Sequence, residues 1–348
     1  MNTATCPAYL PWGLIVTGPV YLRNLIATRT VDVNGAQITG QLACARAKLD
    51  GKTGPDTWGR ALNAQGVTVR ASLYLRNLIA TGTVVVAGAQ IVGQLSCTGA
   101  KLDVKTGPDT WGRALSAQGV TVGESLFLSN LTATGTVDVN AAHIDGQLDC
   151  TGASLDGKGA TAPNAYRMEV KQGFFWCQIK QTLGQITLAN ATVGDLTDDM
   201  ASWPDDIILD GFTYDRISAA PTDARPRRNW LRKGASRGGA VFPQPYTQLA
   251  SVLSQMGHDR AARKIPMARE RALAEDHLAQ DQARYQRLRN VTDPGERGDA
   301  GWVWLAMHSA RFWSQLIRFV AGYGYAPERA LYCGLVLWAF STVVYFLA

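Results

Sequence analysis

The sequence is poor in the residues that usually carry catalysis or hold a metal ion. Its 348 residues include only four histidines, and Asp, Glu, Lys and Arg together make up 18% of the chain. The histidines are scattered and no two cysteines have C-x-x-C spacing, so metal binding has little support. No G-x-G-x-x-G motif lies between a strand and a helix, as a dinucleotide site requires. We therefore expect no metal, no cofactor and no assignable catalytic residue.

Two weaker hints of an enzyme do not develop into a site. The stretch DGKTG (Asp50–Gly54) resembles part of a phosphate-binding loop, but the first glycine that the motif needs before Lys52 is absent. Asp145 and Asp149 lie close together, yet their counterparts in the other repeats are not acidic. An enzyme such as an oxidoreductase stays possible but has no residues to support it.

The N-terminus lacks the features of a secretory signal. Met1–Pro19 has neither a basic start nor a long apolar core. The net charge is +6 and the pI is about 9.0, a mildly basic balance that a solvated surface explains as well as nucleic-acid binding does. We expect the N-terminal part to face a reducing cytosol, without nucleic acid as a partner.

What the sequence does contain is a long internal repeat. YLRNLIAT begins at Tyr21 and again at Tyr74, and the related FLSNLTAT begins at Phe127, so that each step is 53 residues. WGRAL repeats with the same step. Self-similarity at a fixed period is the signature of a solenoid or another repeat architecture.

A shorter period of 11 residues lies inside the long one. Apolar residues recur at offsets 0, 2, 5 and 7 of each unit, and glycine or asparagine falls at the bends. Four such units plus nine extra residues make up the 53-residue period. The pattern predicts a mainly β fold, a parallel β-helix (β-solenoid) of 11-residue half-coil units over residues 1–217. Two units would form a 22-residue coil, and every second coil would carry a nine-residue insertion.

The cysteines of the repeat should form an interior ladder without disulfides. GQLAC, GQLSC and GQLDC end at Cys44, Cys97 and Cys150. Equivalent residues would lie two coils apart, about 9–10 Å at the usual inter-strand spacing. A disulfide needs Cα atoms within about 7 Å.

The insertions are the candidate partner-binding loops. They read DGKTGPDTWGR (Asp50–Arg60) and DVKTGPDTWGR (Asp103–Arg113), and a looser third begins at Asp156. Stacked in register, they would form parallel rows with a paired tryptophan ridge for a partner. In the alternative, each tryptophan folds back over its own coil and the near-identity reflects duplication. The candidate residues are Lys52, Asp56, Trp58, Arg60, Lys105, Asp109, Trp111 and Arg113.

The C-terminal part changes character. Residues 218–242 have the composition of a basic, glycine-rich linker. Residues 243–290 predict a helical hairpin of the tetratricopeptide kind, in which Gly257 separates the two helices. Tyr246, Leu249, Ala250 and Leu253 share one face of the first helix.

The last segments have the pattern of a membrane anchor. Residues 300–321 predict an amphipathic helix in the membrane interface. Residues 330–348 carry no charge and span about 28 Å as a helix, close to the thickness of a bilayer core. Arg311, Arg318 and Arg329 precede this span and favour a cytoplasmic N-terminal part at the inner membrane. The expected membrane-contacting residues are Trp302, Trp304, Phe312, Trp313, Trp338 and Tyr345.

Three motifs together support a family resemblance. They are FPQPYTQLASVLSQMGHDRAARKIPMARE (Phe242–Glu270), GYGYAPERAL (Gly322–Leu331) and the coil motif GQLxCxGAxL. The chain resembles bacterial, actinobacterial-type pentapeptide-repeat-like β-solenoid proteins with a C-terminal membrane segment. Members are often labelled oxidoreductases, but the resemblance supplies no catalytic residues.

These patterns lead to one main functional hypothesis and two alternatives. The main one is a membrane-tethered scaffold whose solenoid presents a rigid surface to the cytoplasm. Its partners would be the lipid bilayer and either another protein or a second copy of the chain. The first alternative is a membrane-acting effector, pore-forming or defensive, and the second is an enzyme.

Overall fold

The computed structural model describes residues 3–4, 13–51, 59–104, 112–234, 236–237 and 240–289, and the single residues Leu305, Ser309, Leu335, Trp338 and Thr342. The chain divides into two units. The first comprises Met1–Thr222 with Asn229–Gly234, and the second comprises Asp223–Arg228 with Ala235–Ala348.

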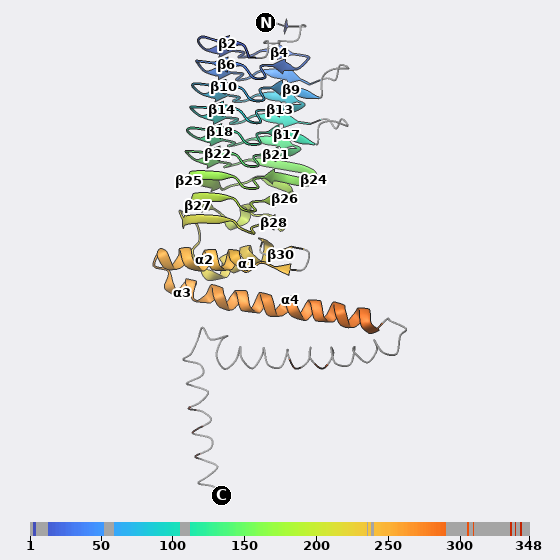
Figure 1. Cartoon of the computed structure of the whole chain (residues 1–348), viewed down its shortest axis with the longest axis vertical. Helices are drawn as coiled ribbons and strands as arrows, with labels where there is room; N and C mark the ends of the chain where they lie inside the picture. Colours follow the sequence, from blue (N-terminus) through green and yellow to red (C-terminus); the bar gives the residue numbers. More distant parts are fainter. Residues whose placement is uncertain are drawn as a thin grey trace. The chain divides into compact units, whose positions relative to one another are not determined.

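The first unit is a parallel β-solenoid, as the repeat predicts, with four strand positions per coil (Figure 1). The first position is occupied by β2 (Ile15–Val16), β6 (Gln37–Ile38), β10 (Thr68–Val69), β14 (Gln90–Ile91), β18 (Thr121–Val122) and β22 (His143–Ile144). The second is occupied by β3 (Val20–Tyr21), β7 (Leu42–Ala43), β11 (Leu73–Tyr74), β15 (Leu95–Ser96), β19 (Leu126–Phe127) and β23 (Leu148–Asp149). Both continue into β25 (Glu169–Trp176), β27 (Thr192–Asp198) and β29 (Thr213–Ile217), which makes one 15-stranded sheet.

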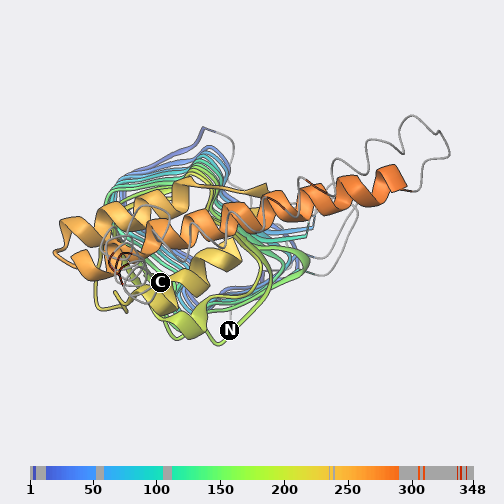
Figure 2. The ribbon, with the colours of Figure 1, turned by 90° about the horizontal axis from the view of Figure 1, so that it is seen from below.

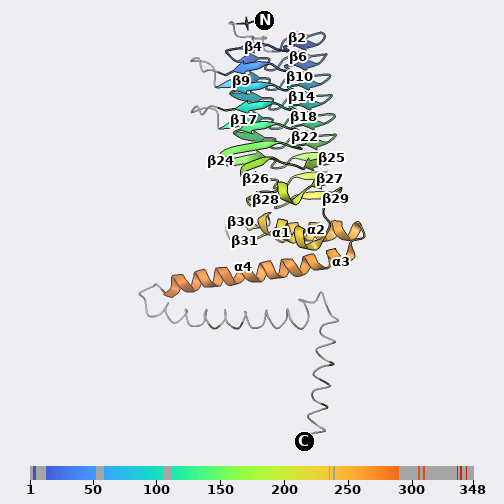
Figure 3. The same cartoon turned by 180° about the vertical axis from the view of Figure 1, so that it is seen from behind.

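The other two positions form a 14-stranded sheet on the opposite side (Figure 3). The third position is occupied by β1 (Thr3–Ala4), β4 (Ile26–Ala27), β8 (Lys48–Asp50), β12 (Ile79–Thr81), β16 (Lys101–Asp103) and β20 (Thr132–Thr134). The fourth is occupied by β5 (Val31–Asp32), β9 (Arg60–Asn63), β13 (Thr83–Val85), β17 (Arg113–Ser116) and β21 (Thr136–Asp138). Both continue into β24 (Ser154–Asn164), β26 (Gln181–Thr187) and β28 (Ile207–Ile208).

The register confirms the predicted coil. Thr68 pairs with Gln37 of the preceding coil and with Gln90 of the following coil. The stretch from Gln37 to Thr68 contains the first insertion, whereas the stretch from Thr68 to Gln90 contains none, and together they make one long repeat. The coils therefore alternate between a plain 22-residue turn and one that carries nine more residues. Seen from below, the coils lie over one another (Figure 2).

The predicted cysteine ladder is also confirmed. The Cys44 amide donates to the Tyr74 carbonyl, and the Leu75 amide donates to the Ser96 carbonyl, one residue before Cys97. Leu75 therefore lies between the two cysteines inside the solenoid. Cys44, Cys97 and Cys150 are buried and free. Burial raises the pKa of the Cys44 and Cys97 thiols to about 12.

Aromatic side chains close the C-terminal end of the solenoid. The rings of Trp176 and Trp203 stack with centroids 5.6 Å apart, and Trp230 lies 5.6 Å beyond Trp203. The Trp176 indole donates to the carbonyl of Ser202, in the short helix η1 (Met200–Ser202). The Gly234 carbonyl accepts a hydrogen bond from the Leu209 amide. This bond joins the segment that carries Trp230 to the turn after β28.

The predicted linker is in fact partly structured. Residues 218–242 contain helix α1 (Ala224–Gly234) and a hairpin of β30 (Ser236–Arg237) and β31 (Ala240–Val241). The basic composition obscured the helix, because only a few of its residues are apolar. Two of them, Trp230 and Leu231, are buried.

The second unit contains the helices expected after residue 243. They are α2 (Gln244–Gln255), α3 (Asp259–Ala262) and α4 (Lys264–Arg289), and α2 packs against both others. Tyr246, Leu249 and Leu253 on α2 are buried. Gly257 takes a φ of +79°, a left-handed conformation that ends the helix before α3.

The membrane expectation finds no support in the part of the chain that the structure describes. None of the described helices is long and apolar enough to span a bilayer. The predicted helices at 300–321 and 330–348 fall outside the described residues, apart from five single positions. Trp338, one of the expected membrane-contacting residues, is 69% exposed. The anchor stays a prediction from the sequence.

Candidate interaction surface

Two of the eight candidate loop residues lie in the described part of the chain. Arg60 and Arg113 begin β9 and β17, and the other six lie outside the described residues. Thr83 pairs with Arg60, and Arg113 pairs with Thr136. The two arginines therefore occupy the same row of the fourth strand position, two coils apart. Both are partly exposed.

Threonine hydroxyls form hydrogen bonds between neighbouring coils along this edge of the solenoid. Thr30 donates to the Arg60 carbonyl at 2.7 Å, and Thr83 donates to the Arg113 carbonyl at 2.8 Å. Thr136 makes the same bond to Thr161 at 2.7 Å. Each hydroxyl comes from a coil without the long insertion. It bonds to the strand that occupies the fourth position in the next coil, at or near the start of that strand. The exit of each insertion is thus fixed by side-chain bonds as well as by the strand ladder.

The third insertion is shorter than the first two. Val84 pairs with Leu115 across the second insertion, and Val137 pairs with Pro163 across the third. The chain from Val137 to Pro163 is shorter than the chain from Val84 to Leu115. The remaining residues continue β24 through Lys158, whose ammonium donates to the Val104 carbonyl at 2.6 Å. The looser third copy seen in the sequence is therefore a tight turn.

A row of mostly polar residues lies beside the two arginines. Pairing through the fourth strand position aligns them in the order Asp32, Asn63, Val85, Ser116, Asp138 and Asn164. We call these six residues the acid–amide row. Asp138 is 1% exposed although its side chain lies outside the apolar core, since its neighbours cover it.

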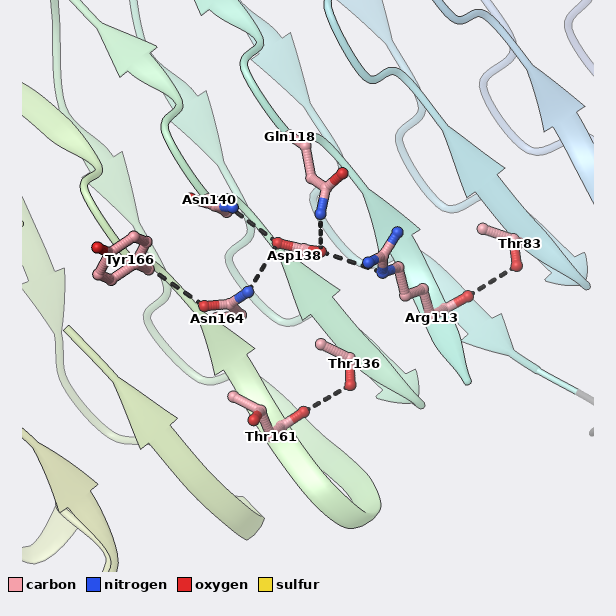
Figure 4. A network of polar contacts seen from close by, with 9 residues as sticks. All are labelled: Thr83, Arg113, Gln118, Thr136, Asp138, Asn140, Thr161, Asn164 and Tyr166. Atoms are coloured by element: carbon pink, nitrogen blue, oxygen red, sulfur yellow. Dashed lines mark hydrogen bonds and ion pairs between the residues drawn. The ribbon is translucent and has the colours of Figure 1, made fainter. Parts of the chain in front are cut away.

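Asp138 is the centre of a closed hydrogen-bond network (Figure 4). Gln118 donates to its Oδ2 at 2.6 Å, and Asn164 donates to its Oδ1 at 3.1 Å. The backbone amide of Asn140 donates to Oδ1 as well. Arg113 Nε lies 3.1 Å from Oδ2 and forms an ion pair with it. A buried carboxylate needs such compensation, and here four donors supply it.

Arg60 is held differently, because the residue equivalent to Asp138 in its repeat is Val85. Its guanidinium donates to Asn63 Oδ1 at 3.3 Å, and Asn63 in turn donates to Asp32 Oδ2 at 3.0 Å. Both arginines are therefore anchored to the acid–amide row. Arg113 is anchored directly to a charge, and Arg60 is anchored through an amide.

Sequence reasoning missed this row. The available signal was the motif VDVN, which occurs at Val31–Asn34 and again at Val137–Asn140. In both copies the aspartate side chain accepts a hydrogen bond from the backbone amide of the asparagine two residues later. An aspartate that alternates with core valines and bonds its own turn is a recognisable turn signal.

A second repeated feature lies on the opposite sheet. Arg23 stacks over Tyr21 and Arg76 over Tyr74, with the guanidinium carbon 4.7 and 4.8 Å from the ring centroid. Gln41 and Gln94 donate to the two tyrosine hydroxyls. In the third copy the pair becomes Phe127 and Ser129, so the third repeat lacks this feature.

No family model, no curated protein and no solved structure matches this chain.

A further group of titratable side chains lies on and next to the first strand position. Asp145 Oδ1 lies 2.7 Å from Lys171 Nζ and 3.2 Å from His143 Nε2, and His143 Nδ1 lies 3.1 Å from Glu169. The bond from Lys171 lowers the pKa of Asp145. All four side chains are partly exposed, and Lys171 and Asp145 form an ion pair. Among the described residues, no group of three or more His, Cys, Asp or Glu side chains could hold a metal ion.

Proposed function

We propose that this protein is an interaction scaffold whose solenoid presents rows of side chains to a protein partner. The observation that carries the proposal is the register of Arg60 and Arg113. They stand in one row, two coils apart, and each is fixed through its carbonyl by a threonine and through its guanidinium by the acid–amide row. Side chains held this way lose little conformational entropy on binding, and arginine is enriched among residues that dominate interfaces.

The insertions that end at these arginines supply the rest of the surface. Each contains one tryptophan, Trp58 or Trp111. A pair of aromatic side chains at a repeated position is suited to fill pockets on a partner. Tethering to the membrane is part of the proposal on the evidence of the uncharged residues 330–348 alone.

Substitution of both tryptophans tests the partner surface. Full-length wild type and the W58A/W111A variant would serve as baits for quantitative affinity purification with mass spectrometry. We expect a defined partner to bind the wild type and to be depleted at least tenfold with the variant. A V92A/L183A bait, which removes two exposed apolar side chains elsewhere on the solenoid, controls for loss of exposed apolar surface. The same partners at the same yield on all three baits would overturn the proposal.

The tether has an independent test. The full chain and a chain that ends at residue 329 would be compared by membrane fractionation and carbonate extraction. We expect the full chain to stay in the pellet after extraction and the shortened chain to be released. Equal release of both chains would remove the membrane from the proposed function and leave the scaffold.

A further inference from the structure

Charge is divided unequally between the two ends of the solenoid. Residues 13–51 and 59–104 carry eight lysines and arginines but only three acidic residues. Residues 112–222 carry six lysines and arginines and thirteen acidic residues. The N-terminal coils are therefore net positive and the later coils net negative. A charge division along one rigid body creates a long-range field of opposite sign at its two ends.

Five of the eight basic residues of the N-terminal coils lie along one edge. Arg23, Arg46 and Arg76 lie in the turns between the second and third strand positions, and Lys48 and Lys101 begin the strands that follow. We call these five residues the basic strip. All are exposed, and none of them forms an ion pair with a described residue. Across four coils the strip extends about 14 Å at the usual strand spacing.

The basic strip also carries exposed apolar surface. In the third strand position Lys48 lies between Ile26 and Ile79, which are 37% and 42% exposed. Tyr21 beside Arg23 is 54% exposed. Arginine, tyrosine and aliphatic groups together are typical of a protein interface, whereas a surface that binds only mobile polyanions has no need of exposed isoleucine.

A group of acidic residues lies on another face, on or just after the first strand position of the later coils, at three neighbouring register positions of the strands. It consists of Glu124, Asp145, Glu169, Asp195 and Asp215, which we call the acidic row. Lys171 neutralises Asp145, and Asp195 accepts from Ser218. Glu124, Glu169 and Asp215 are exposed, and of these only Glu169 has a side-chain bond to a described residue, His143.

We propose that the basic strip of one solenoid binds the acidic row of a second copy. The charges are complementary, both surfaces lie on the strands and turns of the stacked coils, and the partner is present wherever the chain itself is present. Because the strip and the row are different surfaces, the contact is heterologous and continues from copy to copy into a closed ring or an open chain. This contact does not involve Arg60, Arg113 or the insertions, so its test is separate from that of the proposed partner surface.

Charge reversal with exchange of partners tests the contact. Full-length chains with two different fluorescent labels would be mixed in one detergent and followed by cross-correlation spectroscopy. We expect wild-type chains to associate in about 0.05 M salt and to separate in about 1 M salt, where charges are screened within about 3 Å. We expect R23E/R46E/R76E and E124K/E169K/D215K each to weaken self-association at least tenfold. A mixture of these two variants should associate again.

Two further variants keep the test decisive. K48E/K101E reverses the two lysines of the strip, which make no side-chain bond to a described residue, and should also weaken association. R260E/R284E/R287E reverses three exposed arginines of the helical unit and should not. Unchanged self-association of the strip variants, or failure of the mixed pair to associate, would overturn the proposal. So would loss of binding to nucleic acid or to anionic vesicles in the strip variants with self-association intact.

Discussion

At the scale of single residues, the acid–amide row shows how this solenoid tolerates buried charge. Asp32, Val85 and Asp138 occupy the same place in three successive repeats. Asp138 is buried but has four donors around it, and one of them is the arginine at the end of an insertion. Two of these donors also occur in the preceding repeat, because Arg60 and Gln65 occupy the positions equivalent to Arg113 and Gln118.

This equivalence predicts that Val85→Asp is tolerated. Arg60, Gln65 and Ser116 would surround the new carboxylate much as their counterparts surround Asp138. We expect the variant to lose less than about 2 kcal/mol of unfolding free energy, because hydrogen bonds to a charged group offset its desolvation. Chemical denaturation followed by circular dichroism measures the change.

The adjacent Val84→Asp is the matched control, since Val84 is fully buried and faces the apolar core. It should cost more than about 4 kcal/mol or prevent folding, because nothing there can compensate a charge. Equal destabilisation by the two substitutions would show that the donors of the repeat do not act as described.

The cysteine ladder leads to a prediction about reactivity. A thiol with a pKa of about 12 is ionised in about one molecule in 10,000 at pH 8, and Cys44 and Cys97 are fully buried as well. Cys177 also has a raised pKa, mainly from burial, but it is only half-buried. We expect iodoacetamide at pH 8 to label Cys177 well before Cys44, Cys97 and Cys150.

Peptide mass spectrometry after timed labelling measures the rates, and the same experiment in denaturant gives the rates of the unprotected thiols. The difference between the sites should vanish on unfolding. Labelling of Cys97 as fast as Cys177 in the folded protein would contradict the interior ladder.

At the scale of elements, the turns explain why asparagine and glycine alternate along one edge. Asn77 takes a φ of +53° in the turn after β11. In the next coil Gly99 stands at the equivalent position, and a Cβ there would lie 2.5 Å from the Asn77 Oδ1. The asparagine side chain therefore occupies the space that the glycine leaves open. Asn130 and Gly152 repeat the arrangement.

Gly99→Ala should consequently cost more stability than Gly119→Ala. Both glycines have a positive φ, of +67° and +61°, and share the conformational penalty of about 1 kcal/mol. Only Gly99 adds a steric conflict, because a Cβ on Gly119 meets nothing within 4 Å. Because the Asn77 side chain must turn away to make room, Gly99→Ala should have the lower melting temperature in thermal unfolding, and a lower value for Gly119→Ala would contradict the stacked turn.

At the scale of the whole molecule, the solenoid is a stack in which each coil contacts only its neighbours. The C-terminal coils depend on their aromatic closure, where Trp230 contacts Trp203 and Tyr214. Trp230→Ala should remove about 3–5 kcal/mol from these coils, and local unfolding should begin there.

Hydrogen exchange resolves that effect along the chain. In the W230A variant we expect faster exchange in β27 and β29 and unchanged exchange in β10–β15, since coupling passes only between neighbouring coils. W338A removes an exposed tryptophan and should change neither region. Uniformly faster exchange throughout the solenoid would show global instead of local coupling.

The sequence alone determined the solenoid, its 22-residue coil and the cysteine ladder. These follow from period and polarity, because apolar residues at offsets 0, 2, 5 and 7 bury themselves only if coils stack in register. It also located α2–α4, where the apolar face and Gly257 were visible. It did not show α1, because the few apolar residues of that helix are buried by contacts distant in the chain.

Only the tertiary structure decided which polar residues belong together. Arg113 and Asp138 are well separated along the chain but lie in adjacent coils. The acid–amide row is likewise aligned by strand pairing, and the basic strip and the acidic row consist of residues that stacking brings near one another. Their positions depend on the length of each insertion and on the hydrogen-bond register between coils, and hydrophobic periodicity by itself specifies neither.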